Sequence, residues 1–171
     1  MVFVNSMSDL FHARVDVGFI RQLIEVIRET PQHTYQILTK RVARARKIGA
    51  SIDWPSNLWL GASVEDMAVA HRVEDLRQIP AAVKFLSCEP LLGNLSWLSL
   101  EGIDWVIAGG ESGTSARPMH IDWARAIRDN CQVHQVPFYF KQWGGRSPKI
   151  EGRLLDGRIW DDYPEQVARH G

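Results

Sequence analysis

The sequence predicts an α/β protein: a partial (β/α) barrel of about six parallel strands with outer helices, plus a small C-terminal β-hairpin. Two observations predict this fold class. Short β-prone apolar runs alternate with segments of helical period from residue 2 to residue 140, and strands separated by such helices pair in parallel through crossover connections. Near the C-terminus, Asp156-Gly157 separates two apolar runs, and this dipeptide is typical of a two-residue hairpin turn.

Three strand and helix pairs make up the first half of the chain. The predicted strands are residues 2–4, 34–38 and 57–64, and the predicted helices are residues 16–30, 41–48 and 66–79. In the first helix, the apolar residues recur at helical spacing, and Pro31 ends the pattern; they are Val17, Ile20, Leu23, Ile24 and Ile27. Gly49 can end the second helix, and Pro80 follows the third.

The second half continues the alternation. Strands are predicted at residues 82–86, 105–108 and 137–140, and a helix from about residue 122 to residue 135 places Trp123, Ile127 and Cys131 on one stripe. The hairpin falls in residues 153–160. We therefore expect a partial barrel domain over residues 1–145 and a C-terminal extension with the hairpin over residues 146–171.

The composition is that of an ordinary globular domain. The 171 residues include 20 Lys and Arg against 20 Asp and Glu, so no global charge attracts the protein to nucleic acid or to a membrane. No apolar run approaches the length of a membrane span, and the N-terminus lacks the order of a secretory signal. These features predict a cytoplasmic protein with no membrane partner.

The two cysteines, Cys88 and Cys131, lie in different predicted elements and have no Cys-x-x-Cys spacing. We expect both to be small buried apolar side chains rather than metal ligands or disulfide partners. The histidines also lack the spacing of a metal site, so no metal is predicted in this chain.

Polar residues follow every predicted strand, and in a parallel sheet or barrel these strand ends meet at one edge, where α/β proteins build their sites. The sequence thus predicts a ligand-binding rim, in which glutamates accept hydrogen bonds and Arg117 and Lys141 hold a carboxylate or phosphate. His12 fits either an acid–base group or a structural histidine, and the catalytic residues are unknown. The rim residues are Asn5, Asp9, His12, Lys40, Glu65, Glu89, Gly109, Gly110, Glu111, Arg117 and Lys141.

Two details of the rim are specific enough to test. Gly109 and Gly110 would let the backbone approach a ligand closely or adopt positive φ. Lys141 leaves the sixth strand beside the fifth, so we expect it to pair with Glu111 and to mark the floor of the ligand site.

The blocks VFVNSMSDLFH, PQHTYQILTKR, NLWLGASVED, FLSCEPLLG, DWVIAGGESGTSARPMH and VPFYFKQWGG cover nearly all of residues 2–145. They resemble, in order, a phage-associated family of uncharacterised three-cysteine proteins. That family is similar to radical S-adenosylmethionine enzymes, and distantly to spore photoproduct lyase, which repairs DNA. The resemblance implies a partial (β/α) barrel in which three closely spaced cysteines hold a [4Fe-4S] cluster that cleaves S-adenosylmethionine.

The family's cysteines lie upstream, in a segment that reads approximately Trp-Asn-Pro-x-x-Gly-Cys followed by Cys-x-x-Cys-Tyr. This chain begins at the block VFVNSMSDLFH. S-Adenosylmethionine and the cluster are therefore implied for the full-length family only, and no cofactor is expected in this chain. We expect the chain to be a truncation, or to have a misassigned start, and to be inactive without the cluster segment.

Two functions compete. The first is the barrel portion of an enzyme, whose rim binds a small polar or nucleotide-like ligand. The alternative is a non-catalytic nucleic-acid-binding module, in which Lys40, Arg41, Arg44 and Lys47 meet phosphates. Whether the chain is an enzyme stays open between them. Self-association through an exposed N-terminal strand edge is a further expectation.

Overall fold

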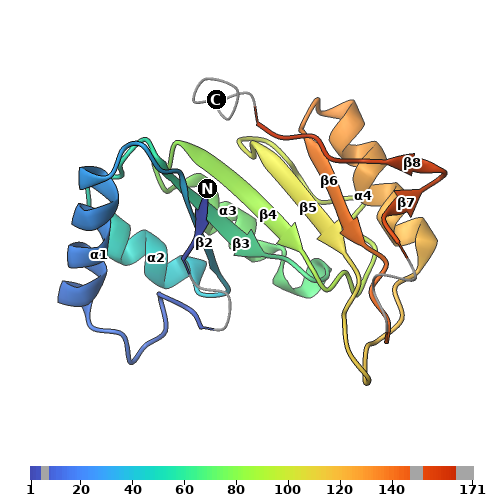
Figure 1. Ribbon diagram of the computed structural model, residues 1–171, viewed down its shortest axis with the longest axis horizontal. Coiled ribbons are helices and arrows are strands. Elements are labelled where there is room, and N and C mark those ends of the chain that lie inside the picture. The colour runs from blue at the N-terminus through green and yellow to red at the C-terminus, as the bar shows by residue number, and fades with distance from the viewer. Residues whose placement is uncertain (5–7, 147–151, 165–171) are drawn as a thin grey trace.

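The computed structural model describes residues 1–4, 8–146 and 152–164, and it confirms the predicted fold class. Six parallel strands lie side by side in chain order and form a curled half-barrel, and a separate antiparallel hairpin follows (Figure 1). The elements are β1 (Val2–Phe3), α1 (Val17–Glu29), β2 (Tyr35–Thr39), α2 (Val42–Gly49), β3 (Leu58–Ser63), the 3₁₀ turn η1 (Met67–Val69), α3 (His71–Arg77), β4 (Val83–Cys88), β5 (Trp105–Gly109), α4 (Ile121–Val133), β6 (Phe138–Gln142), β7 (Leu154–Leu155) and β8 (Arg158–Ile159).

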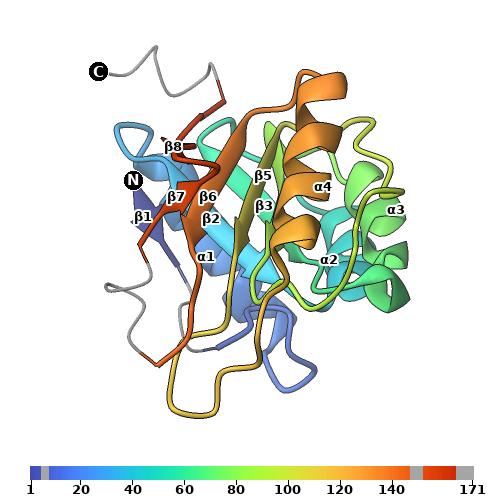
Figure 2. The same cartoon turned by 90° about the vertical axis from the view of Figure 1, so that its right-hand side faces the viewer.

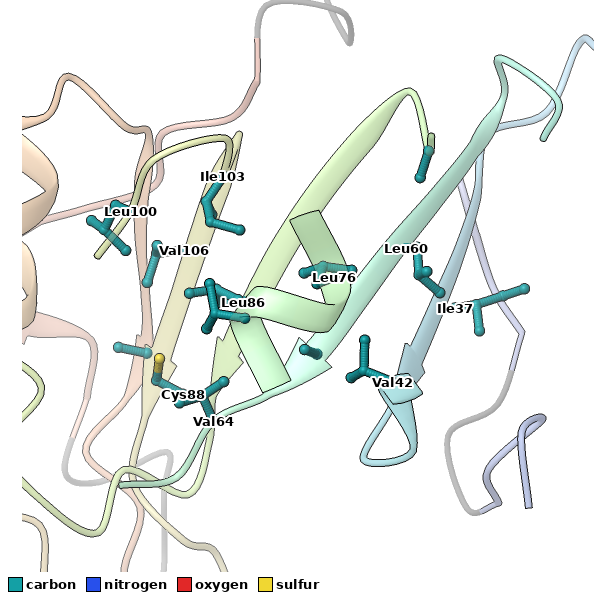
Figure 3. Close-up of a cluster of buried hydrophobic side chains, with 14 of the residues drawn as sticks. Ile37, Val42, Leu60, Val64, Leu76, Leu86, Cys88, Leu100, Ile103 and Val106 are labelled. Atoms are coloured by element: carbon teal, nitrogen blue, oxygen red, sulfur yellow. The ribbon is translucent and has the colours of Figure 1, made fainter. Parts of the chain in front are cut away.

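Helices α2, α3 and α4 lie on the same side of the sheet (Figure 2), where α2 packs against α3. Helix α1 begins at Asp16, whose side chain accepts a hydrogen bond from the Phe19 amide, and it buries Ile20, Ile24 and Ile27. Apolar side chains from the strands and helices meet in one continuous core, which includes Leu60, Leu86 and Val106 of the sheet and Leu76 of α3 (Figure 3).

The predicted third helix is wrong in its length. Residues 67–69 form a tight 3₁₀ turn, in which the Asp66 carboxylate accepts from the Ala68 amide, and the α-helix starts only at His71. Val73 and Leu76 are buried, and Val69 of the 3₁₀ turn is half-buried.

The connection from β4 to β5 contains no helix. Leu91, Leu95, Leu98, Leu100 and Ile103 are buried in the core instead. Their burial fills the space that a crossover helix would cover in a regular (β/α) repeat, so the parallel pairing of β4 and β5 is kept without one.

The C-terminal extension packs against the edge of the half-barrel. The predicted turn is confirmed, with Asp156 and Gly157 both at positive φ between β7 and β8. Beyond β8 the chain runs antiparallel to β6, where the Phe140 amide donates to the Trp160 carbonyl at 2.8 Å. This segment covers one edge of the sheet, whereas Val2 and Phe3 are exposed at the other. Self-association through β1 stays a prediction, and so does the domain boundary at residue 145.

Both cysteines are buried and free, as predicted. Burial raises the pKa of the Cys88 thiol to about 12 and also raises the pKa of Cys131. None of the helices in the described part of the chain is long and apolar enough to cross a membrane.

Candidate functional site

The strand ends meet at one edge of the sheet, and ion pairs hold the predicted carboxylates there. Glu65 lies between Lys40 and Arg72, with N···O distances of 2.6 and 2.9 Å. Burial raises the pKa of Glu65, but the hydrogen bond from Lys40 and the two cations outweigh burial, so the net pKa is lowered. Arg72, which the sequence analysis did not select, is thus part of the rim.

Glu111 pairs with Arg117, and not with Lys141 as the sequence analysis predicted. The Arg117 guanidinium donates to both carboxylate oxygens, at 2.7 and 2.9 Å, and the Arg117 amide donates as well. These bonds lower the pKa of Glu111 to about 2. Arg117 lies only six residues from Glu111 in the sequence, so the loop after β5 supplies the partner of this carboxylate. Lys141 pairs with a different residue.

Lys141 pairs with Glu89 at 3.0 Å. The two residues lie on β6 and just after β4, on either side of Gly109, which ends β5. A Cβ atom at Gly109 would lie 3.4 Å from the Lys141 Cβ, an ordinary van der Waals contact. The ion pair thus spans the end of β5, and the pairing depends on which residues lie on the two neighbouring strands.

Gly109, which ends β5, and Gly110, which follows it, both contact other parts of the chain. Neither has positive φ, and a Cβ at Gly110 would lie 1.8 Å from the carbonyl oxygen of Trp143. A Cβ at Gly144 would lie 2.3 Å from the Glu111 carbonyl oxygen, and Ser112 forms a β-bridge with Gly145. The sequence predicted that a ligand would approach the backbone closely at these glycines. At Gly110 the atoms that approach are backbone atoms of Trp143 and Gly144, and a direct role of the glycines in ligand binding stays a prediction.

The remaining rim residues differ in their surroundings. Asp9 accepts from the Thr39 hydroxyl, the Lys40 amide and the Arg41 guanidinium, and these bonds outweigh its burial, so its pKa is lowered. His12 accepts from the amide of Arg14, two residues on, and its carbonyl accepts from the Arg44 guanidinium of α2. Asn5 lies outside the described residues.

Five residues of this charged rim surround one pocket of about 380 Å³: Lys40, Glu65, Arg72, Glu111 and Arg117. The structure thus brings together four of the residues that the sequence analysis selected. Each of these charged groups already has a partner of opposite charge.

A second pocket, of about 260 Å³, lies on the concave face of the sheet, opposite the helices. Phe85, Trp105, Tyr139 and Tyr163 supply aromatic walls, and the Glu89–Lys141 pair lies at one end. The Trp105 ring packs on Tyr163 at 4.9 Å between centroids, and its Nε1 donates to the Asp162 carbonyl. The C-terminal extension thereby contributes one wall, which no pattern in the sequence predicted.

One residue that lines the concave pocket has a buried amide nitrogen with no hydrogen-bond partner among the described residues. Gln36 of β2 lines the pocket and is 8% exposed. Its Nε2 atom is buried, and no atom of the described residues accepts from it. A buried donor of this kind costs about 1–3 kcal/mol of stability. The one available signal was a glutamine inside the apolar run TYQIL.

A further pocket, of about 520 Å³, lies at the amino ends of β4, β5 and β6, with Gly102, Asp104 and His134 in its lining. This edge is opposite the rim. Among the described residues, no buried and unpaired side-chain donor belongs to this pocket. It therefore offers no observation in favour of a bound ligand.

Fold and site together define an α/β half-barrel protein with an aromatic-walled pocket of about 260 Å³ on its concave face and a charged rim at the strand ends. The chain belongs to the family described as "Protein of unknown function (DUF5131)", which matches residues 1–164. Comparison with curated proteins gives no match, and comparison with solved structures gives none either.

Proposed function

We propose that this chain is the barrel portion of a radical-SAM-like enzyme of phage-associated origin, and that it binds a small polar or nucleotide-like ligand on the concave face near the strand ends. The proposal combines the resemblance of the sequence blocks with the site geometry. The pocket lies just below the roughly 300–1,000 Å³ of typical small-molecule sites, which favours a ligand with one flat ring system over a polymer.

The observation that carries the binding proposal is the unpaired Gln36 amide. Buried polar groups in native proteins nearly always have a partner, and an exception calls for an explanation such as a missing ligand. Here the amide lines a pocket with aromatic walls, and aromatic side chains stack well on a flat ring. An acceptor atom on such a ring would satisfy Gln36 while the rings cover its faces.

The cluster that the resemblance implies does not fit the residues present. A [4Fe-4S] cluster of this type needs three thiolates, whereas the chain contains two cysteines, and both are buried in the apolar core. The described residues hold no group of three metal-ligating side chains. No chemical step through a cluster is therefore derived for this chain.

Replacing Gln36 with leucine is expected to abolish ligand binding and to raise stability by about 1–2 kcal/mol, because the change removes an unpaired buried amide. Adenosine and indole serve as flat probes in isothermal titration calorimetry, and urea unfolding gives the stability. Gln132→Leu, on the exposed side of α4, is the matched control. A Gln36→Leu variant that binds the probes as the parent protein does, or that is less stable, would contradict the proposal.

Anaerobic reconstitution with iron and sulfide is expected to leave this chain without a stoichiometric cluster, because two buried thiols of raised pKa are poor ligands. Iron analysis and absorbance spectroscopy give the measurement. About four irons per chain, with the absorbance of a [4Fe-4S] cluster, would refute the expectation.

A nucleic-acid interface on α2 is the alternative proposal, but the contacts of this helix do not favour it. Lys40 pairs with Glu65, Arg41 pairs with Asp9, and Arg44 donates to the His12 and Val15 carbonyls. In the described part of the chain, Lys47 alone of the four has neither ion pair nor hydrogen bond. A salt-sensitive gel shift with single- or double-stranded DNA would support the alternative.

A further inference from the structure

Gly61, in the middle of β3, is the one residue of this strand without a side chain. In the parallel register it pairs with Leu38 of β2 and with Phe85 of β4, and both of these neighbours line the concave pocket. Side chains alternate between the two faces along each strand, so residues paired in register lie on the same face. A side chain at position 61 would therefore point toward the concave pocket.

The Phe85 ring occupies the place that such a side chain would take. A Cβ atom at Gly61 would lie 2.3 Å from the Cε2 and Cζ atoms of Phe85 and 2.7 Å from its Cδ2 atom. Carbon atoms in contact are about 3.5–4.0 Å apart, so the ring lies directly against the β3 backbone. Phe85 thus lines the pocket from the side of the sheet, and it can lie this low only because residue 61 is a glycine.

The neighbours of Phe85 determine where its ring would move if this space were filled. The Trp105 ring of β5 lies beside it, at 5.9 Å between centroids, and Trp59 and Val83 complete the same buried cluster. Interiors of this kind are close-packed, so the cluster does not yield a ring-sized space. A side chain at position 61 would therefore push the Phe85 ring away from the sheet and into the pocket.

The floor that Phe85 provides separates the two ligand contacts that the pocket offers. Gln36, with its unpaired amide, lies on β2, and Trp105 lies on β5, with β3 and β4 between them. Three strand spacings come to about 14 Å along the sheet. A ligand that accepts from Gln36 and also packs on Trp105 must pass over the Phe85 ring, and two fused rings span more of this distance than one.

We propose that Gly61 sets the size of ligand that the concave pocket accepts, and that this ligand carries a flat system of two fused rings, which lies over Phe85. The inference rests on the proposed ligand-binding function and specifies its ligand class. Gly61 is a positioning residue, because it acts through the Phe85 ring and does not itself line the pocket. Gln36 binds the acceptor at one end of the ligand, and Trp105 covers the other ring.

Isoquinoline and pyridine are a matched pair of probes, because each has one ring nitrogen that accepts a hydrogen bond and they differ by one fused ring. Titration calorimetry on the full chain is expected to show isoquinoline binding about tenfold more tightly than pyridine. Gly61→Ala should weaken isoquinoline binding about tenfold or more. Pyridine binding should change little, because a single ring needs only the Gln36 end of the pocket.

Phe85→Val turns this comparison into a double-mutant cycle. Valine lacks the δ, ε and ζ atoms that a Cβ at position 61 would meet, so Gly61→Ala should not weaken isoquinoline binding in the Phe85→Val background. Gly49→Ala is the matched control, since a Cβ there would lie 2.7 Å from the Trp54 ring, outside the concave pocket. Thermal unfolding of each variant should show that Gly49→Ala loses stability while its isoquinoline binding is kept.

The outcomes separate the inference from the proposed function. Three results overturn the inference alone: a parent protein that binds adenosine or indole but not isoquinoline, a Gly61→Ala variant that binds isoquinoline as the parent does, or a loss that Phe85→Val does not suppress. If the parent protein binds none of isoquinoline, pyridine, adenosine and indole, the proposed function fails and the inference with it.

Discussion

Replacing Gly110 with alanine is expected to destabilise the protein by about 3 kcal/mol or more, at the upper end of what overpacking costs. The new Cβ would lie 1.8 Å from the Trp143 carbonyl oxygen and 2.6 Å from its carbon. Both are backbone atoms, so the loops after β5 and β6 would have to move apart. Urea unfolding gives the free energy change.

The neighbouring glycine is the control for this prediction. A Cβ at Gly109 meets its nearest atoms at 3.4 Å, which neighbouring groups can accommodate, and Gly109→Ala is expected to change stability by about 1 kcal/mol or less. If Gly110→Ala unfolds at the same urea concentration as the parent protein, the interlocking of the two loops is not a source of stability.

Replacing Trp105 with alanine is expected to cost about 3–5 kcal/mol, the usual range for a large aromatic side chain in a core. Trp105 is 3% exposed and contacts the rings of Trp59, Phe85, Tyr139 and Tyr163. The change would also release the C-terminal segment, because the Trp105 indole donates to the Asp162 carbonyl at 2.9 Å. Hydrogen exchange at the Phe140 and Asp162 amides should then accelerate.

Trp105→Phe separates the two contributions. Phenylalanine keeps most of the ring packing and removes the indole donor, so a loss of about 1 kcal/mol is expected, the net value of one hydrogen bond. If this variant loses as much stability as Trp105→Ala, the hydrogen bond to the C-terminal segment contributes more than the ring packing. That result would contradict the expectation that packing dominates at Trp105.

The rim could be predicted from the sequence only as a set of residues. Parallel strands bring their carboxyl ends to one edge, so Lys40, Glu65, Glu111 and Arg117 had to lie near one another, and they surround one pocket. Which charge pairs with which could not be predicted. A pairing depends on the face toward which each side chain points, on the register shift between Ala108 and Gly109, and on local loops such as the one that joins Glu111 to Arg117.

The concave pocket likewise could not be predicted from the sequence. Trp105 and Tyr163 are far apart in the chain but stack in space, and no local pattern predicts such a contact. Gln36 is an ordinary polar residue in a strand until its neighbours are known. Only the packed structure shows that its amide has no partner among the described residues.

The sequence by itself determined the order and type of the elements, the parallel sheet and the hairpin turn at Asp156-Gly157. These follow from periodicity, chain connectivity and local backbone preference, each of which acts over a few residues or one connection. The tertiary structure alone decided the Lys141–Glu89 pair, the close packing of Gly110 against the Trp143 backbone and the aromatic walls of the pocket. These contacts join residues that are distant along the chain, and they depend on register and packing, which no local pattern encodes.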